Sequence, residues 1–189
     1  MIRLAIFASG SGSNAENIVN YFSGRPDVKI SLLISNNSTA GVHKRMEKLG
    51  IPSFTYSKND FDEVDPVLEK LAEYDIDWIV LAGFLKKIPV RMLQMYPGRI
   101  INIHPALLPK YGGKGMYGMH VHEAVVAAKE TETGITIHHV NENYDEGPAI
   151  FQETCVVLPT DTPEDVANKI HALEYEHFPR VIEQLILKK

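Results

Sequence analysis

The segment Ile2–Phe22, which reads IRLAIFASGSGSNAENIVNYF, decides the fold. Its first part is a short, mostly apolar run that stops at Ser9 and Gly10, which is typical of a buried strand. Its last part, from Asn14, spaces apolar residues at the intervals of one helix face. Glycine and serine alternate between these two parts. The segment therefore predicts a strand, a tight loop and a helix in that order.

The alternation of strand and helix continues through the first half of the chain. Apolar runs predict further strands at residues 28–34, 53–56, 78–82 and 99–103. Amphipathic runs predict helices at residues 14–22, 41–49, 60–74 and 89–95. Strands that alternate with helices favour a parallel sheet with helices on both faces.

The second half of the chain has a different character. A loop rich in Gly and Pro precedes a predicted helix at residues 120–129. Two predicted strands follow, joined by a turn-rich stretch, at residues 134–140 and 149–157. A last helix is expected from Thr162 toward Leu187, with a kink at Pro179. The expected fold class is α/β in a single domain over residues 1–189, mostly parallel, with antiparallel strands in the C-terminal part.

Composition and charge exclude several classes of protein. The chain has 189 residues, 44% hydrophobic and 23% charged, with a net charge of −5. It has no cluster of Lys and Arg that would make a nucleic-acid-binding face. No apolar run approaches the ~20 residues of a membrane span, and the amino terminus does not resemble a signal peptide. The one cysteine, Cys155, forms no intrachain disulfide and is expected to be a small apolar strand residue. We therefore expect a cytoplasmic protein with small-molecule partners.

The glycine loop after the first strand suits a phosphate group. Glycine lets the backbone turn tightly and approach a ligand, and the following helix start offers free N–H groups. Read as far as Ala15, the loop also matches a dinucleotide-binding pattern, G-x-G-x-x-A. That pattern requires an acid after the second strand, where this chain has Ser35-Asn36-Asn37. A single phosphate is therefore the better hypothesis, against the alternative of a plain tight turn.

Asn102 and His104 follow one another at the end of a predicted strand. Because they are two residues apart, their side chains leave the same face of that strand. An amide and an imidazole are a suitable pair for acyl chemistry, since both can stabilise an oxyanion and the imidazole can also move protons. The alternative is that both are polar strand-end residues bonded to the next loop.

Asp145 precedes Glu146-Gly147-Pro148, where an acid often serves only the turn. The functional alternative places its carboxylate near His104, where it favours the protonated imidazole and orders a water.

The remaining histidines give a rival hypothesis of a metal site. Their spacing does not favour it, because His120 and His122 are not three or four apart on their helix. We therefore expect no metal.

Four strings in the sequence match one known family. They are Asn102–Tyr111, Ala82–Leu85, Thr133–His138 and Tyr144–Pro148. Together they resemble the signature of the glycinamide ribonucleotide transformylases, and Asp145 stands at that family's catalytic aspartate. The resemblance runs from the first strand to the last helix. An Asn-x-His with a later Asp is shared by the wider formyltransferase superfamily, whereas the glycine–serine loop is more specific.

The resemblance implies a Rossmann-like formyltransferase fold and a known reaction. In that reaction the formyl group of 10-formyltetrahydrofolate passes directly to the amine of glycinamide ribonucleotide, without a metal, in purine biosynthesis. Residues 1–100 would bind the nucleotide phosphate, and residues 101–189 would hold the catalytic and folate-binding groups. A homodimer is the open alternative to a monomer.

The family's functional residues carry over onto matching positions of this chain. The catalytic residues would be Asn102, His104 and Asp145. Those that bind the substrate phosphate side would be Gly12, Ser13, Asn14, His171 and Glu174. Those that bind folate would be Leu85, Lys86, Ile88, Asn141 and Tyr144. Supporting residues behind the catalytic groups would be Thr136 and His138.

The chain departs from the family pattern at three places. Glu146 stands where the family often has Gly, and Lys86 where Arg is common. The stretch Gly112–Gly118 is longer and richer in glycine, and we interpret it as a lid over the folate cleft. The rival functions are a hydrolase of formyl-folate, a formyltransferase to methionyl-tRNA or a sugar nucleotide, a non-catalytic nucleotide-binding regulator, and a metal-dependent hydrolase.

Overall fold

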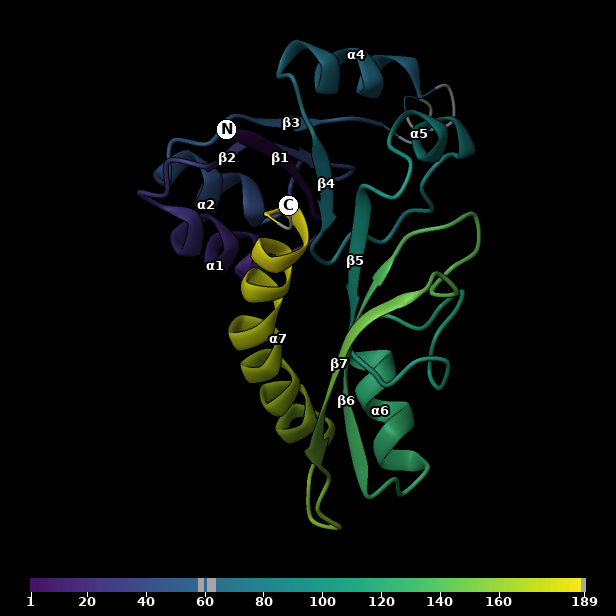
Figure 1. Cartoon of the computed structure of the whole chain (residues 1–189). Helices are drawn as coiled ribbons and strands as arrows, with labels where there is room; N and C mark the ends of the chain where they lie inside the picture. The colour runs from purple at the N-terminus through teal and green to yellow at the C-terminus, as the bar shows by residue number, and fades with distance from the viewer. Residues whose placement is uncertain (58–59, 61–63, 188–189) are drawn as a thin grey trace. The chain divides into compact units, whose positions relative to one another are not determined.

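The computed structural model describes residues 1–57, 60 and 64–187 (Figure 1). Within these residues, seven strands form a sheet in the order β3-β2-β1-β4-β5-β6-β7. The chain divides into two compact units, Met1–Ile101 and Asn102–Lys189. Strand β5, Ile100–His104, contains the division between them. The predicted α/β class, mostly parallel with antiparallel strands in the C-terminal part, is confirmed.

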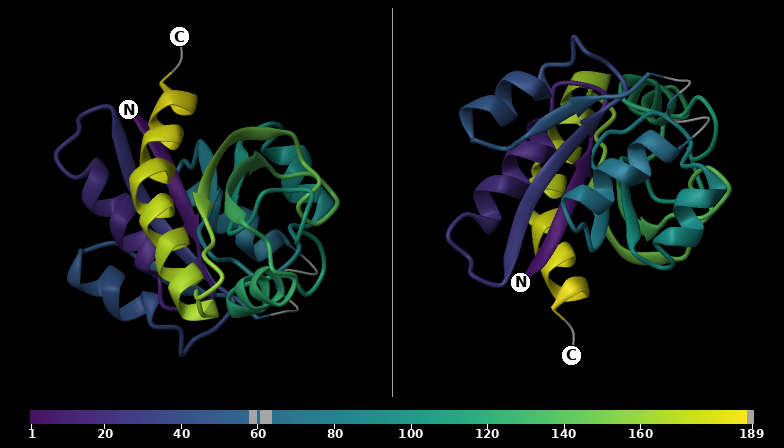
Figure 2. Two further views of the ribbon diagram at one scale, coloured as in Figure 1. Left: turned by 90° about the horizontal axis from the view of Figure 1, so that it is seen from below. Right: turned by 90° about the horizontal axis from the view of Figure 1, so that it is seen from above.

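The first unit repeats strand and helix in the way that the sequence predicts. Its strands are β1 Ile2–Phe7, β2 Val28–Ser35, β3 Ser53–Thr55 and β4 Trp78–Leu81. Its helices are α1 Ser13–Phe22, α2 Val42–Lys48, α4 Asp65–Glu73 and α5 Val90–Met95. Strand β1 pairs in parallel with both β2 and β4, and β2 pairs in parallel with β3. Figure 2 shows α1 and α2 on one side of β1 and β2, and α4 on the other.

Burial explains why the first segment becomes a strand and a helix. Leu4 to Phe7 of β1 are fully buried in succession, as a strand covered on both faces requires. Helix α1 buries Ala15, Ile18, Val19 and Phe22, which are its predicted apolar face. Each large apolar side chain buried in this way contributes roughly 1.5–3 kcal/mol relative to exposure.

The second unit is built on an antiparallel pair of strands. It contains α6 Met119–Ala127, β6 Glu132–His139, β7 Ala149–Val156 and α7 Pro163–Ile186. The β6–β7 register pairs Thr136 with Gln152 and breaks between Ile137 and His138. Helix α7 contacts both strands and α6, and it continues through Pro179 without interruption.

The observed boundaries lie close to the predicted ones. For the helix predicted at 60–74, the structure gives α4 from Asp65, and residues 61–63 of the prediction lie outside the described residues. Cys155 is a half-buried residue of β7, and burial raises the pKa of its thiol. In the described part of the chain, no helix has the length and apolar character needed to cross a membrane.

Candidate active site

The glycine loop of the first unit is shaped by Gly12. This residue precedes α1 with a φ of 78° and packs so closely on α2 that an added Cβ would lie 2.3 Å from Val42 Cγ2. The first helical hydrogen bond of α1 runs from Glu16 N to Gly12 O, at 2.9 Å. The amides of Ser13 and Asn14 therefore lie in the first turn, where the helix itself uses no N–H group. This is the backbone arrangement that binds phosphate in other proteins.

Side chains around the loop hold it in place. Arg45 donates from Nε to Ser11 O at 2.9 Å and forms an ion pair with Glu16. Ser9 Oγ donates to Asn36 Oδ1 at 2.5 Å and accepts from Leu85 N at 2.9 Å. Asn36 stands where a dinucleotide-binding site needs an acid. Its side chain is thus hydrogen-bonded to Ser9, at the start of the loop. This arrangement argues against the dinucleotide alternative.

The three residues of this unit that were predicted to bind folate follow β4. Leu85 is 46% exposed and Lys86 is exposed, whereas Ile88 is buried. The N–H of Leu85 is held by Ser9. The side chain of Ile88 therefore packs within the unit, and only its backbone and the two residues before it can offer atoms to a ligand.

The second unit brings Asn102, His104, Asp145 and His138 together. His104 Nδ1 lies 3.5 Å from Asp145 Oδ2, and His138 Nε2 lies 3.7 Å from Asp145 Oδ1. Asn102 Nδ2 lies 3.1 Å from His138 Nε2. The side chains of His104, His138 and Asp145 are 4%, 2% and 12% exposed. The carboxylate of Asp145 therefore faces two buried imidazoles, and the amide of Asn102 completes the group.

Backbone carbonyls assign the tautomers of both imidazoles. Because a carbonyl can only accept, the 2.8 Å contact between His104 Nε2 and Tyr111 O places a proton on Nε2. In the same way, the 2.9 Å contact between His138 Nδ1 and His139 O places a proton on Nδ1. In the neutral ring His138 Nε2 then accepts from the amide of Asn102. His104 keeps Nδ1 as the atom that can take or give a proton beside Asp145.

Charge and burial set the protonation states of the cluster. Burial lowers the pKa of His104, and this outweighs the opposite effects of the Asp145 charge and of the bond to Tyr111. Burial would raise the pKa of Asp145, but His138, His104 and the Gly113 amide more than offset it and lower that pKa. At neutral pH the group is thus a carboxylate beside a neutral imidazole. The charge of Asp145 favours the protonated imidazole of His104, and desolvation, which opposes it, has the larger effect on the pKa.

Asp145 is held in place by the loop that precedes α6. It has a φ of 57°, which is unusual for a residue other than glycine. Its Oδ2 accepts from Gly113 N at 2.9 Å. Asn141, predicted to bind folate, uses Oδ1 to accept from Asn143 N at 2.9 Å, and Tyr144 is 39% exposed. Gly113 belongs to the stretch interpreted as a lid, and its bond to Asp145 closes that stretch onto the cluster.

Thr136, for which a supporting role is expected, is hydrogen-bonded to the chain after His104. Its Oγ1 donates to Ala106 O at 2.7 Å and accepts from Leu108 N at 3.0 Å. Gln152 Nε2 donates to the same hydroxyl at 2.9 Å and to Leu108 O at 3.1 Å. The sequence interpretation missed Gln152, although polar residues facing each other on two predicted strands were a usable signal.

The last two residues predicted on the phosphate side lie on α7, close to a histidine that was not assigned. His171 is exposed and stacks on Tyr175 at 6.1 Å, whereas Glu174 is buried. His122 of α6 is 3% exposed, and its Nδ1 has no hydrogen-bond partner among the described residues. Burial, with the charges of His171 and His104, lowers the pKa of His122 to about 4. At neutral pH His122 is therefore a buried, uncharged ring whose pKa is influenced by His171 and His104.

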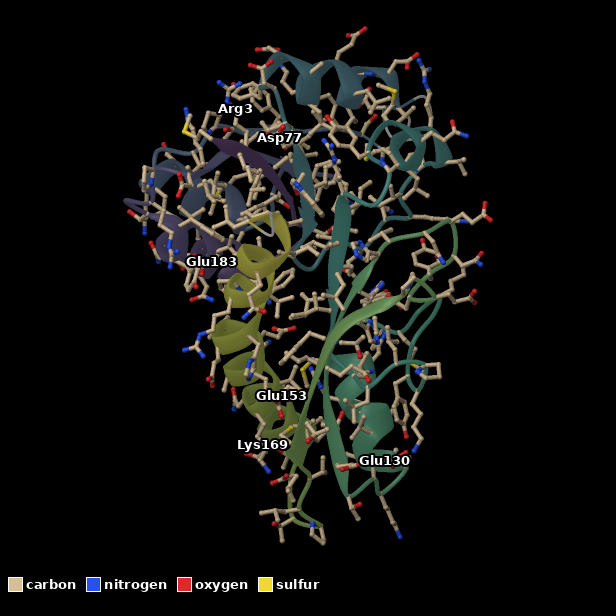
Figure 3. All side chains as sticks on the ribbon, in the orientation of Figure 1. Arg3, Asp77, Glu130, Glu153, Lys169 and Glu183 are labelled. Carbon is tan, nitrogen blue, oxygen red and sulfur yellow. The ribbon has the colours of Figure 1, made fainter. Side chains whose placement is uncertain are left out.

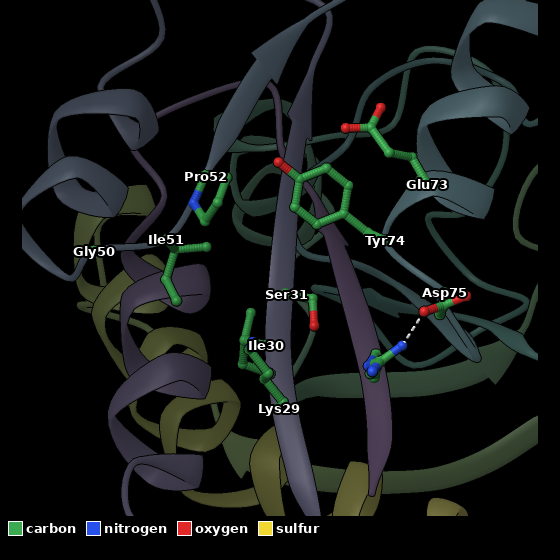
Figure 4. Close-up of a pocket in the computed structure, with 10 residues that line it drawn as sticks. Lys29, Ile30, Ser31, Gly50, Ile51, Pro52, Glu73, Tyr74 and Asp75 are labelled. Atoms are coloured by element: carbon green, nitrogen blue, oxygen red, sulfur yellow. Dashed lines mark hydrogen bonds and ion pairs between the residues drawn. The ribbon is translucent and has the colours of Figure 1, made fainter.

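Within residues 1–57, 60 and 64–187, no group of three or more His, Cys, Asp or Glu side chains is arranged to hold a metal ion. A cavity of about 420 Å³ lies at the amino ends of the strands of the first unit (Figure 4). Arg3, Ser31, Ile51 and Tyr74 are among the residues that line it. None of the predicted site residues lines this cavity, and the glycine loop lies at the other end of β1.

Comparison with known proteins agrees with this geometry. The profile of the formyl transferase family matches residues 2–182. A phosphoribosylglycinamide formyltransferase of Bacillus subtilis is 37% identical over 98% of this chain and 95% of its own length. The chloroplastic enzyme of that name from Arabidopsis thaliana is 39% identical over 95% of this chain, which spans only 64% of that relative.

A solved structure gives the same relationship in three dimensions. The phosphoribosylglycinamide formyltransferase from Anaplasma phagocytophilum superimposes with a TM-score of 0.91 at 34% identity. The match covers 100% of this chain and 88% of that one. The chain therefore belongs to the formyl transferase family, and within it to the phosphoribosylglycinamide formyltransferases.

Proposed function

We propose that this chain transfers the formyl group of 10-formyltetrahydrofolate to the amine of glycinamide ribonucleotide, as a cytoplasmic enzyme of purine biosynthesis. The observation that carries the proposal is the buried cluster in which Asp145 faces His104 and His138 beside Asn102. Both substrates are small molecules, and formyl-folate is a co-substrate rather than a resident group. The chemistry asks for no metal, because an amide and an imidazole supply the oxyanion donors and the proton carrier.

The reaction begins with attack of the substrate amine on the formyl carbon. The electron pair of the carbonyl moves to oxygen, and Nδ2 of Asn102 donates a hydrogen bond to the oxyanion. His104 is neutral at rest, so its Nδ1 accepts the proton that the attacking nitrogen loses. The negative charge forming beside it raises the pKa of His104 and makes this transfer favourable.

Collapse of the tetrahedral adduct returns the proton. The imidazolium of His104 gives its Nδ1 proton to the folate nitrogen, directly or through a water ordered by Asp145, as the carbon–nitrogen bond breaks. The products are the formylated ribonucleotide and tetrahydrofolate. Asp145 stays ionised throughout, which is consistent with its lowered pKa, and stabilises the imidazolium while it exists.

Other residues would bind the two substrates. Ser13 and Asn14, at the start of α1 after Gly12, would hold the phosphate with backbone N–H groups, and His171 and Glu174 would complete that side. Leu85, Lys86 and the backbone of Ile88 would contact folate, with Tyr144 and the turn formed by Asn141. Thr136 and His138 would support Asn102 and the chain after His104.

The first test is an absorbance assay of folate product, run in chelator with 10-formyltetrahydrofolate or a stable deaza analogue. Turnover that requires glycinamide ribonucleotide supports the proposal and shows that no dissociable metal is needed. Turnover without the ribonucleotide would show a formyl-folate hydrolase instead. No turnover in either reaction, with ribonucleotide binding retained, would favour the nucleotide-binding regulator.

A further inference from the structure

The ring of His104 is oriented by a single backbone carbonyl, that of Tyr111. The Nε2–H of His104 donates to this carbonyl at 2.8 Å, whereas the contact of Nδ1 with Asp145 is longer, at 3.5 Å. Tyr111 has a φ of 55°, in the left-handed region that residues other than glycine rarely adopt. A residue other than glycine persists in this conformation only where its surroundings hold it.

Glu130 holds the Tyr111 side of this loop. It lies just beyond the C-terminal end of α6 (Figure 3). Its Oε1 accepts from the hydroxyl of Tyr111 at 2.9 Å and from Nζ of Lys110 at 3.0 Å. Both Lys110 and Tyr111 lower the pKa of Glu130, so it is a carboxylate at neutral pH. One charged group thus ties two successive residues of the loop to the end of a helix.

The other side of the loop is tied to the catalytic carboxylate. The N–H of Gly113 donates to Asp145 Oδ2, the same oxygen that faces His104 Nδ1. A Cβ at Gly112 would lie 2.5 Å from Leu108 Cδ2 and 3.3 Å from Asp145 Cβ, so the loop packs tightly there. The segment 110–113 therefore controls the neighbours of both ring nitrogens of His104. Glu130 is its anchor on the side away from Asp145.

We propose that Glu130 is a positioning residue for His104: by holding Tyr111 and Lys110 it keeps the Tyr111 carbonyl on Nε2 and leaves Nδ1 facing Asp145. Glu130 itself touches neither His104 nor, in the proposed reaction, a reacting atom. Its kinetic consequence rests on the proposed function, whereas its effect on the tautomer of His104 does not. The two parts can therefore be tested separately.

The direct test reads the imidazole of His104 by ¹⁵N NMR of the full chain. We expect the unaltered protein to show protonated Nε2 and unprotonated Nδ1 at neutral pH. Glu130→Ala should shift the signals toward a mixture of tautomers, and Tyr111→Phe, which removes the hydroxyl but keeps the carbonyl, should shift them in the same direction. Glu130→Gln keeps an acceptor for Tyr111 and should restore most of the original spectrum.

Glu123→Ala is the matched control, because Glu123 is an exposed acid on α6 whose side chain makes no hydrogen bond or ion pair among the described residues. It should leave the His104 signals unchanged.

In the formyl-transfer assay Glu130→Ala should lower kcat about 10- to 100-fold, the scale expected from misplacing a catalytic group by about 1 Å. KM for the ribonucleotide should change less than about twofold, and the acid limb of the pH profile should move to lower pH, because the Tyr111 bond raises the pKa of His104.

Each outcome decides between the two parts of the proposal. An unchanged His104 spectrum in Glu130→Ala, or an equal change in Glu123→Ala, would overturn the positioning role. A changed spectrum in Glu130→Ala and Tyr111→Phe alone would support it even if the unaltered chain transferred no formyl group, in which case only the proposed function fails. If Glu130→Ala does not fold, Tyr111→Phe and Glu130→Gln carry the same comparison.

Discussion

The glycine loop and the catalytic cluster are both built around residues with positive φ, but they are fixed in opposite ways. Gly12 adopts a φ of 78° without steric cost, and its lack of a side chain allows contact with Val42. Tyr111 and Asp145 adopt φ values of 55° and 57° although they carry side chains. Tyr111 is held there by the hydrogen bond that its hydroxyl donates to Glu130, and Asp145 by the one that it accepts from Gly113 N. The shape of the glycine loop thus depends on its backbone, whereas the geometry of the catalytic cluster depends on contacts of its side chains.

This difference predicts which substitutions matter in each region. In the loop, adding a Cβ should do more harm than removing a side chain, because the backbone N–H groups remain in either case. In the cluster, removing a side chain should abolish chemistry while the fold survives. The predictions that follow test this division, beginning with the largest expected effect.

His104→Ala should reduce kcat by about 10²–10⁴-fold, which is the usual contribution of a positioned group that carries protons. It should leave the dissociation constant of the ribonucleotide nearly unchanged, because the glycine loop is intact. Steady-state kinetics and calorimetric titration with the ribonucleotide measure the two quantities. A large loss of ribonucleotide affinity in a folded variant would contradict the separation of loop and cluster.

The buried ring of His122 should make the second unit sensitive to acid. Its pKa of about 4 lies below the usual 6.5, so below pH 6.5 the unfolded chain binds a proton that the folded chain takes up only near pH 4. The free energy of unfolding should therefore fall through this window by about 3 kcal/mol from this residue. His122→Leu should remove that part of the pH dependence, measured by denaturant unfolding at pH 7 and pH 4. An unaltered pH dependence in the variant would mean that the folded protein already admits the proton.

Gly12→Ala tests how the shape of the glycine loop depends on its backbone. The new Cβ would meet Val42 at 2.3 Å in a left-handed conformation, so we expect a loss of about 1–3 kcal/mol in the free energy of unfolding and a raised KM for the ribonucleotide. Gly10→Ala is the matched control in the same loop, because a Cβ there has no neighbour within 4 Å. Equal effects of the two substitutions would show that general loop flexibility, and not the contact with Val42, matters.

The sequence predicts the first unit better than the second for a physical reason. Strand β1 and helix α1 follow from the periodicity of their own apolar residues, which is local information. The shared face of Asn102 and His104 is also local, because it follows from the two-residue repeat of a strand. These features could be predicted without knowledge of contacts.

The environment of His104 depends on contacts between distant positions. That Asp145 meets His104 was one of two alternatives for its turn, and only the family resemblance favoured it. The roles of Tyr111 and Glu130 depend on the left-handed backbone conformation of Tyr111, which no local sequence pattern predicts. The pairing of Thr136 with Gln152 requires the register of β6 and β7, which breaks between Ile137 and His138. The balance between burial and charge at His104 likewise needs the packed structure.

The smallest expected effects concern the starts of helices α1 and α7, which differ in the same way as the glycine loop and the catalytic cluster. Helix α1 begins after Gly12 with no side-chain cap, whereas α7 begins with a capping box of Thr162 and Asp165. Thr162→Ala should lower the free energy of unfolding by about 1 kcal/mol, and Thr162→Gly by only a few tenths. Ser13→Ala, at the uncapped start of α1, should change it by less than about 0.5 kcal/mol.

Denaturant unfolding of these three variants tests whether a side-chain cap stabilises the start of α7 and not that of α1. A cost for Ser13→Ala as large as that for Thr162→Ala would mean that the hydroxyl of Ser13 stabilises the start of α1. The glycine loop would then depend on side chains as the catalytic cluster does, and the contrast between the two regions would apply only to Gly12.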